Sequence, residues 1–256
     1  MKITHEHSEN GVTEQLFELE VAGAIVPGAL WTPQGARGPR PLVLFRHGGG
    51  QHRKAPAAVG TGTRYAQALG WAVVAIDAPD HGTRVAPEDA ARVAERERAL
   101  ITRAGGMRGE ALESALRRAA IAEREWKATL DATQALDVVG AQGPVAYVGL
   151  SMGTILGIPF VAGEPRVKAA ALGLAGVSGP EQALAQAARR ITIPVEFVMQ
   201  WDDASVPREE ALALFAAFAS PEKSLHGNPG GHGEVPLFER ASREGFLLRH
   251  LGQAKS

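Results

Sequence analysis

Short apolar segments with the length of β-strands recur along the chain, and amphipathic sequence separates them. A strand that is apolar at every position is buried on both faces, as happens when helices connect parallel strands and cover both sides of the sheet. Segments of this kind lie at 41–45, 72–76, 145–149, 167–174 and 193–199, with a weaker one at 223–226. The sequence therefore predicts an α/β architecture with a mainly parallel sheet.

The sequence between these segments carries the signals of amphipathic helices. Residues 120–139 place apolar side chains such as Trp126 and Leu130 between charged ones. The segment 207–219 begins with Pro207, which favours the first turn of a helix. Further helices are predicted to end before Gly70, to follow residue 153 and to cover 238–251.

Residues 12–32 are typical of a β-hairpin whose turn is the small-residue sequence 22–24. Pro27 and Pro33 suggest that this hairpin has an edge position, because proline cannot donate a hydrogen bond to a neighbouring strand.

The segment 83–120 has no strand signal and consists of charged, alanine-rich helical sequence that glycines interrupt. We expect a helical cap over 83–120, inserted within a single domain of residues 1–256, because long connections in compact domains are often lids. The alternative is an elongated crossover helix.

The composition of the 256 residues excludes several classes of protein. The formal net charge is −1 and no basic excess favours nucleic acid or an anionic membrane. The absence of cysteine excludes disulfides, zinc–thiolate sites and a cysteine nucleophile. No apolar stretch is long enough to span a membrane, and the polar first ten residues do not resemble a signal peptide. We therefore expect a cytoplasmic monomer or homodimer.

A G-x-S-x-G motif lies between the apolar segment 145–149 and a segment that can begin a helix, and it reads Gly149-Leu150-Ser151-Met152-Gly153. A serine at such a strand–turn–helix junction sits on a strained turn that exposes its hydroxyl, and the glycines allow close backbone approach. The motif predicts Ser151 as a nucleophile. The alternative is a serine that caps the following helix.

A glycine run, Arg46-His47-Gly48-Gly49-Gly50, follows the apolar segment 41–45 directly. In enzymes with a nucleophile of this kind, a backbone N–H from such a loop helps to bind an oxyanion, and the residue after the nucleophile, Met152, supplies the second N–H. The alternatives are a flexible loop or a phosphate cradle, but the Lys-Ser/Thr ending of a P-loop is absent.

The order of residues along the chain predicts the acid and the histidine that would act with Ser151. An acid and then a histidine follow such a serine nucleophile along the chain. Asp202 and Asp203 come directly after the segment 193–199, and His232 lies in a glycine-rich loop after 223–226. A carboxylate after a strand lies at the carboxyl edge of the sheet, where α/β sites are built.

Together these motifs resemble the α/β-hydrolase superfamily, in particular its small serine esterases and dienelactone-hydrolase-like members. The resemblance covers the chain from about residue 24 and rests on 47–49, 77–82, 149–153, 203–207 and His232. It implies an α/β-hydrolase fold, with an eight-stranded, mostly parallel sheet flanked by helices and an antiparallel second strand. The chain departs from the pattern in two ways: dienelactone hydrolases proper use cysteine, and Asp80 stands where glycine is usual.

The resemblance also selects among the candidate site residues. The acid of the family lies four residues before a proline, which favours Asp203 over Asp202 because Pro207 follows. The residue after His47-Gly48 donates to the oxyanion, which implies Gly49. We assign His47, Gly48 and Gly50 to the substrate-binding loop, with His47 bracing this loop rather than reacting.

No metal or cofactor is expected. His47, His52, Asp80 and His81 show no spacing typical of metal ligands. The arginines of 83–120 alternate with glutamates, as on a solvated helix face. The alternative is that one arginine holds a substrate carboxylate, for which Arg46 and Arg53 are further candidates.

These observations predict a carboxylesterase-like serine hydrolase, of class EC 3.1.1, that cleaves a small-molecule ester through an acyl-enzyme on Ser151. His232 would act as general base and acid, and Asp203 would orient it. The alternatives are a peptidase or thioesterase, a lyase or cofactor-free peroxidase on the same fold, and a ligand-binding receptor with a silent site.

Overall fold

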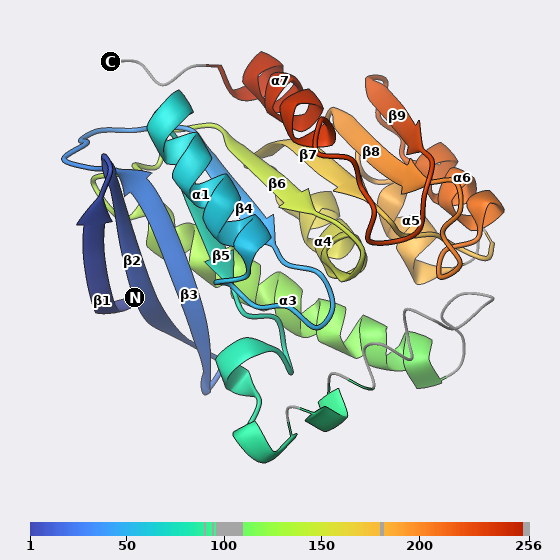
Figure 1. Ribbon diagram of the computed structural model, residues 1–256, viewed down its shortest axis with the longest axis horizontal. Coiled ribbons are helices and arrows are strands. Elements are labelled where there is room, and N and C mark those ends of the chain that lie inside the picture. The colour runs from blue at the N-terminus through green and yellow to red at the C-terminus, as the bar shows by residue number, and fades with distance from the viewer. Residues whose placement is uncertain (90, 94, 96–109, 180–181, 253–256) are drawn as a thin grey trace.

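The computed structural model describes residues 1–89, 91–93, 95, 110–179 and 182–252. Its centre is one sheet with the strand order β1-β2-β3-β5-β4-β6-β7-β8-β9 (Figure 1). The strands are β1 (Lys2–Glu9), β2 (Val12–Val21), β3 (Ala24–Pro33), β4 (Leu42–Arg46), β5 (Ala72–Ile76), β6 (Val145–Gly149), β7 (Val167–Gly173), β8 (Val195–Gln200) and β9 (Lys223–Asn228). Pairs from β5 through β4 to β9 are parallel, which confirms the mainly parallel α/β sheet.

Within the residues that the structure describes, the sheet has nine strands rather than the expected eight. The additional strand, β1, pairs antiparallel with β2 and is exposed along its whole length, so it has no apolar pattern to reveal it. A tight turn joins the two strands, in which Asn10 and Gly11 both have positive φ, of 50° and 78°. Asn-Gly is the preferred sequence for such a hairpin turn.

The hairpin predicted over 12–32 is formed by β2 and β3, but it does not lie at the edge of the sheet. β3 lies between β2 and β5 and pairs antiparallel with both. Its pairing with β5 covers only Gly28 to Trp31. Pro27 and Pro33 lie just outside this stretch, so neither proline leaves a gap in the β3–β5 ladder.

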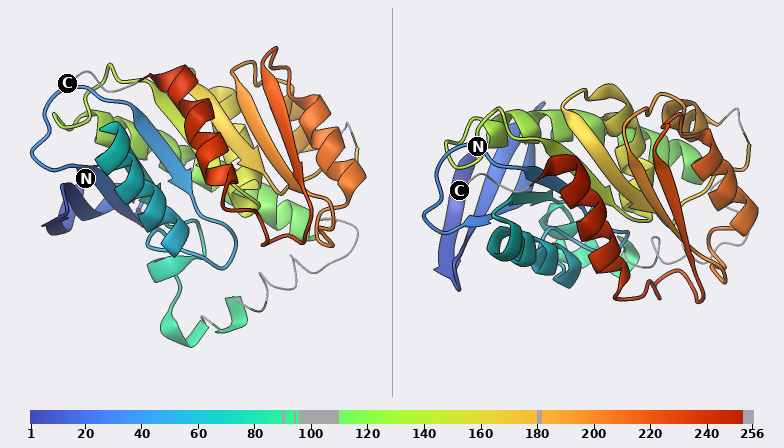
Figure 2. Two further views of the ribbon diagram at one scale, coloured as in Figure 1. Left: turned by 45° about the horizontal axis from the view of Figure 1, so that its top comes forward. Right: turned by 90° about the horizontal axis from the view of Figure 1, so that it is seen from above.

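Helices cover both faces of the sheet. They are α1 (Pro56–Leu69), α3 (Glu110–Gln134), α4 (Met152–Gly163), α5 (Ala183–Ala188), α6 (Arg208–Ala217) and α7 (Glu239–Leu251), with short 3₁₀ turns η1 (Gly82–Arg84) and η2 (Pro87–Asp89). The views of Figure 2 show α1 and α7 on one face and α3 to α6 on the other. Among the helices that the structure describes, none is long and apolar enough to cross a membrane.

Each face of the sheet has its own core. On the α3 face, Trp126 packs edge-on against Tyr147 of β6, with ring centroids 6.0 Å apart. On the α1 face, Tyr65 packs edge-on against Trp71 at 5.6 Å. The central strands β4, β5 and β6 are buried at every position, which is why they appear in the sequence as uninterrupted apolar runs.

The segment 83–120 is described only in part. Residues 90, 94 and 96–109 of the predicted cap lie outside the described residues. Residues 110–120 are the first turns of α3, the helix that continues to Gln134 and leads to β6. The cap itself stays a prediction.

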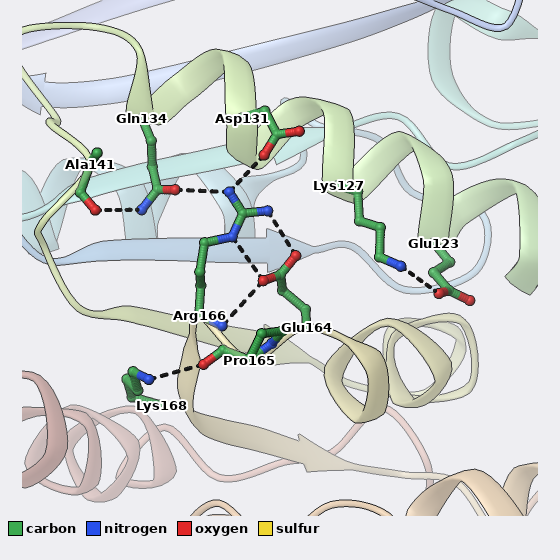
Figure 3. A network of polar contacts seen from close by, with 9 residues as sticks. All are labelled: Glu123, Lys127, Asp131, Gln134, Ala141, Glu164, Pro165, Arg166 and Lys168. Atoms are coloured by element: carbon green, nitrogen blue, oxygen red, sulfur yellow. Dashed lines mark hydrogen bonds and ion pairs between the residues drawn. The ribbon is translucent and has the colours of Figure 1, made fainter.

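An arginine-centred network fastens α3 to the turn between α4 and β7, at the edge of the sheet where β7 begins (Figure 3). Arg166 pairs with Glu164 at 2.8 Å and with Asp131 of α3 at 2.6 Å, and also bonds Gln134. The hydrogen bond from Arg166 holds the pKa of Glu164 below its ordinary value. The network fixes α3 against the α4–β7 turn.

Candidate active site

Ser151 lies at the junction of β6 and α4 in a strained backbone conformation, with φ 57° and ψ −120°. Its amide donates to the carbonyl of Gly173 at 2.9 Å, which ties the turn to β7. The side chain of Ser151 does not cap α4. A positive φ at a non-glycine residue is costly and persists only where the surroundings enforce it, and such residues gather at functional sites.

The two glycines of the motif are required by close backbone contacts. A Cβ atom on Gly149 would lie 2.7 Å from the carbonyl oxygen of Gly153, and one on Gly153 would lie 2.9 Å from that of Arg46. Both distances are shorter than real contacts of a Cβ atom. The turn can therefore be this tight only with glycine at both positions.

Two buried hydroxyl groups form hydrogen bonds to the backbone around the Ser151 turn. The Thr154 hydroxyl lies 2.6 Å from the carbonyl oxygen of Gly173 and 2.8 Å from that of Gly149, and it accepts the Gly173 amide at 2.8 Å. The Tyr147 hydroxyl donates to Gly153 at 2.8 Å. Sequence reasoning missed both residues, because a threonine in an apolar helix and a tyrosine in a buried strand carry no distinctive signal.

His232 joins Ser151 to Asp203. Its Nε2 lies 2.8 Å from the Ser151 hydroxyl, and its Nδ1 lies 2.6 Å from the Asp203 carboxylate. The three residues come from three different loops, each of which follows a parallel strand: β6, β8 and β9. The structure thus brings together the three residues for which the sequence predicts the roles of nucleophile, base and acid.

The contact with His232 also distinguishes the two neighbouring aspartates, because it is made by Asp203. The second carboxylate oxygen of Asp203 accepts the amides of Ser205 and Val206, at 2.8 and 3.1 Å. Burial raises the pKa of Asp203, but the His232 hydrogen bond and these amides outweigh it, so the pKa lies below its ordinary value. Asp202 instead accepts the amide of Gly230 at 2.9 Å.

The glycine run after β4 forms a loop beside Ser151. His47 is buried under this loop, where its Nδ1 bonds the Gly48 carbonyl at 2.8 Å and its Nε2 accepts the Ala78 amide at 3.0 Å. Burial lowers the pKa of His47 to about 3, so its ring is neutral at physiological pH. Within the described part of the chain, no backbone carbonyl accepts the amides of Gly49 or Met152.

A second buried group locks this loop to the loop after β5. The Asp77 carboxylate accepts the Arg53 amide at 2.7 Å, pairs with the Arg53 guanidinium, and accepts the Thr83 amide at 3.0 Å. Asp80, which stands where glycine is usual, has a φ of 60°. Aspartate is among the residues that best tolerate this left-handed conformation, so the turn keeps its shape without glycine.

The two arginines considered beside the loop have other partners. The Arg53 guanidinium is held by Asp77. Arg46 is fully buried, and its guanidinium lies 5.0 Å from the ring centroid of Trp126 on the α3 face of the sheet. The Arg53 guanidinium is thus committed to Asp77, and that of Arg46 faces the Trp126 ring.

A cavity of about 460 Å³ adjoins the serine and histidine. Gly48 and Gly49 line it, whereas His47 and Gly50 do not. Of the residues expected in the substrate-binding loop, His47 and Gly50 therefore lie outside the lining of this cavity, and the His47 ring is packed under the loop.

No protein-family model and no curated protein matches the sequence. Among solved structures, a cold-adapted esterase from an Arctic intertidal metagenomic library, in a PEG-bound complex, is 33% identical with a TM-score of 0.79, covering 98% of this chain and 100% of that chain. An acetyl xylan esterase from Paenibacillus sp. R4 is 18% identical, with a TM-score of 0.72 and coverage of 98% and 88%.

A candidate dienelactone hydrolase from Klebsiella pneumoniae subsp. pneumoniae MGH 78578 is 15% identical, with a TM-score of 0.68 over 95% of this chain and 100% of that one. The last two similarities show the shared fold, and the 33% identity to the cold-adapted esterase shows the family. The chain therefore belongs to the α/β-hydrolase superfamily, among its small esterase and dienelactone-hydrolase-like members.

Proposed function

We propose that this protein is a carboxylesterase-like serine hydrolase that cleaves a small-molecule ester through an acyl-enzyme on Ser151. The observation that carries the proposal is the continuous contact from the Ser151 hydroxyl through His232 to Asp203, with Ser151 and His232 in the lining of the cavity. This is the geometry that activates a serine hydroxyl at neutral pH.

In this mechanism His232 takes the proton of the Ser151 hydroxyl as the oxygen attacks the ester carbonyl. Asp203 keeps the proton on Nδ1, so that Nε2 faces the serine as an acceptor, and it stabilises the imidazolium that forms. His232 then gives its proton to the leaving alcohol. Water repeats the cycle on the acyl-enzyme and releases the acid.

The developing oxyanion is bound by the amide N–H groups of Gly49 and Met152. Both belong to residues beside Ser151, and no backbone carbonyl in the described residues competes for them. The Met152 amide is also at the first residue of α4, where the helix dipole favours negative charge. Each such donor contributes about 3–4 kcal/mol to transition-state stabilisation.

The esterase to which the chain is 33% identical supports an ester-cleaving reaction, and the fold shared with an acetyl xylan esterase is consistent with it. The cap predicted over 83–120 belongs to the same proposal, because this segment follows β5, whose carboxyl end lies beside that of β4.

The test is hydrolysis of p-nitrophenyl acetate by the wild type and by Ser151→Ala. We expect turnover in the wild type and a loss of several orders of magnitude in the variant, with an unchanged circular dichroism spectrum. A fluorophosphonate probe should label the wild type and fail to label His232→Ala. Normal turnover by Ser151→Ala, or strong labelling of His232→Ala, would refute the assignment.

The same experiment separates an esterase from the other functions that this fold can carry. Identifying the products over a panel of esters, thioesters and peptides distinguishes an esterase from a thioesterase, a peptidase or a lyase. A wild-type protein that the probe does not label at all indicates a receptor with a silent site.

A further inference from the structure

His232 lies in a glycine-rich loop, residues 229–238, that joins β9 to α7 (Figure 1). Three glycines lie within two residues of the histidine, and glycine leaves a backbone free to adopt many conformations. The imidazole must nevertheless stay within hydrogen-bonding distance of both Ser151 and Asp203, at 2.8 and 2.6 Å. A loop of this composition therefore needs contacts outside itself to hold its histidine in one place.

The carboxylate of Glu239 joins the two ends of this loop. Glu239 is the first residue of α7, and its oxygens contact two side chains near the end of β9. One oxygen lies 2.8 Å from Nδ1 of His226, and the other accepts a hydrogen bond from the Asn228 side-chain amide at 2.9 Å. The residue just before the loop is thus bonded to the residue just after it. We call the contacts of Glu239 with His226 and Asn228 the loop clamp.

The loop clamp is shielded from water. Glu239 is 8% exposed and Asn228 is 5% exposed. A hydrogen bond to a buried charged group is stronger than one between neutral groups, and removing one partner leaves the other buried and unsatisfied. A carboxylate at the first residue of a helix is also favoured by the helix dipole. Glu239 is therefore well suited to fix the start of α7 against β9.

His226 also connects the loop clamp to β8, the strand that leads to Asp203. Its Nε2 lies 4.0 Å from the carboxylate of Glu196, which is buried in β8. The two strands pair in parallel as far as Gln200 and Asn228, where both end. The clamp thus holds α7 at the point where the loops of the acid and the histidine both begin.

Glu239 borders the cavity that Ser151 and His232 also line. Each of its oxygens already contacts a side chain of β9, so the carboxylate is committed to the clamp rather than turned toward a substrate. Its effect on the site therefore passes through the loop. A displacement of about 1 Å at a reacting group can lower a rate about a hundredfold, so the place where this loop ends matters for the imidazole.

We propose that Glu239 is a positioning residue for His232. By clamping the ends of the loop 229–238, it sets the distances from the imidazole to Ser151 and Asp203. This inference rests on the proposed serine hydrolase function for the role of His232 as general base.

The kinetic test measures kcat and KM for p-nitrophenyl acetate. Glu239→Ala removes both acceptors, and kcat should fall about tenfold to a hundredfold with KM within about threefold, because a displaced base weakens the transition state and not substrate binding. Glu239→Gln keeps the clamp, since its oxygen can accept from Asn228 and its amide can donate to the other tautomer of His226. This conservative variant should stay within about threefold of the wild type.

Glu222→Ala is the matched control. Glu222, just before β9, lies 3.2 Å from Nε2 of His250 in the last turn of α7, so it joins the same two elements. Eleven residues of helix separate Glu239 from His250, which places this second contact about 16 Å from the clamp along α7. The control variant should keep kcat within about twofold of the wild type.

Amide hydrogen exchange of the segment 229–238 tests the clamp without turnover. Exchange should be about tenfold faster or more in Glu239→Ala and unchanged in Glu239→Gln and Glu222→Ala. Asn228→Ala removes one of the two contacts and should give a smaller increase in exchange and a smaller loss of kcat. This milder variant decides the question if Glu239→Ala does not fold.

Wild-type kcat in Glu239→Ala would overturn the positioning role, as would unchanged exchange of the segment 229–238. A loss in Glu239→Gln as large as that in Glu239→Ala would overturn it too, because the glutamine keeps both contacts. If the wild type turned over no ester, the proposed function would fail instead, and the exchange comparison would still decide whether Glu239 holds the loop.

Discussion

The carboxylate of Asp202 accepts a hydrogen bond from the Gly230 amide at 2.9 Å, and the Asp202 amide donates to the Gly230 carbonyl at 3.1 Å. This pair of bonds joins the loop after β8 to the loop after β9. The next residue, Asp203, reaches past it to His232 at 2.6 Å. Two adjacent aspartates therefore hold one loop at two points, and only the second of them touches the imidazole.

We predict that Asp203→Asn lowers kcat/KM for p-nitrophenyl acetate by about 10⁴-fold, because an amide in place of the carboxylate favours the wrong tautomer of His232. The structurally matched control is Asp202→Asn, which keeps an oxygen acceptor for Gly230 and should stay within about tenfold of the wild type. A larger loss in the Asp202 variant than in the Asp203 variant would reverse the assignment of the acid.

Thr154 should act as a positioning residue for the nucleophile. Thr154→Val keeps the shape of the side chain but leaves the buried Gly173 amide and carbonyl without their hydroxyl partner, at a cost of about 1–3 kcal/mol. We expect a lower melting temperature and a lower kcat with little change in KM, because the turn that carries Ser151 loosens. Thr154→Ser keeps the hydroxyl and should restore both the melting temperature and kcat. If Thr154→Ser lost as much as Thr154→Val, the hydroxyl of Thr154 would not position the nucleophile.

A methyl group at Gly149 should be incompatible with the turn. Gly149→Ala places a Cβ atom 2.7 Å from the backbone oxygen of Gly153, which cannot move without displacing α4. We expect loss of esterase activity and a melting temperature lowered by several degrees in calorimetry. The control is Gly163→Ala at the other end of α4, where the new atom meets Glu123 at an ordinary 3.5 Å and should leave activity unchanged.

The central strands could be predicted from the sequence because their burial is complete. β4, β5 and β6 are buried at every position and, apart from Arg46 at the end of β4, carry no charged residue, which requires helices on both sides. β1 could not be found in this way, since all of its side chains are exposed. The Asn10-Gly11 turn was the available signal for it. The position of β3 was misjudged because pairing with β5 stops short of both prolines.

The three residues of the proposed triad could be selected from the sequence because motif, chain order and strand ends each constrain the choice independently. Residues that support the site through hydrogen bonds to backbone atoms could not be predicted in this way, and Thr154 is the clearest example. The lining of the cavity could not be predicted from the sequence either. Arg64 and Arg243 lie far apart along the chain, and only the packing of α1 and α7 over one face of the sheet brings them to the same cavity.

Buried His47 should make the stability of the fold depend on pH in the acid range. Its pKa, about 3 in the folded protein, lies below the ordinary value of 6.5 because the ring is buried. Below pH 6.5 the unfolded chain binds a proton that the folded protein does not, so stability present above that pH is lost as the pH falls toward 3, at roughly 1.4 kcal/mol per pH unit. Urea unfolding of the wild type and His47→Gln from pH 7.5 to 4 tests this. The difference in unfolding free energy should be largest above pH 6.5 and shrink as the pH falls, and a constant difference would show that His47 has the same pKa in the folded and unfolded states.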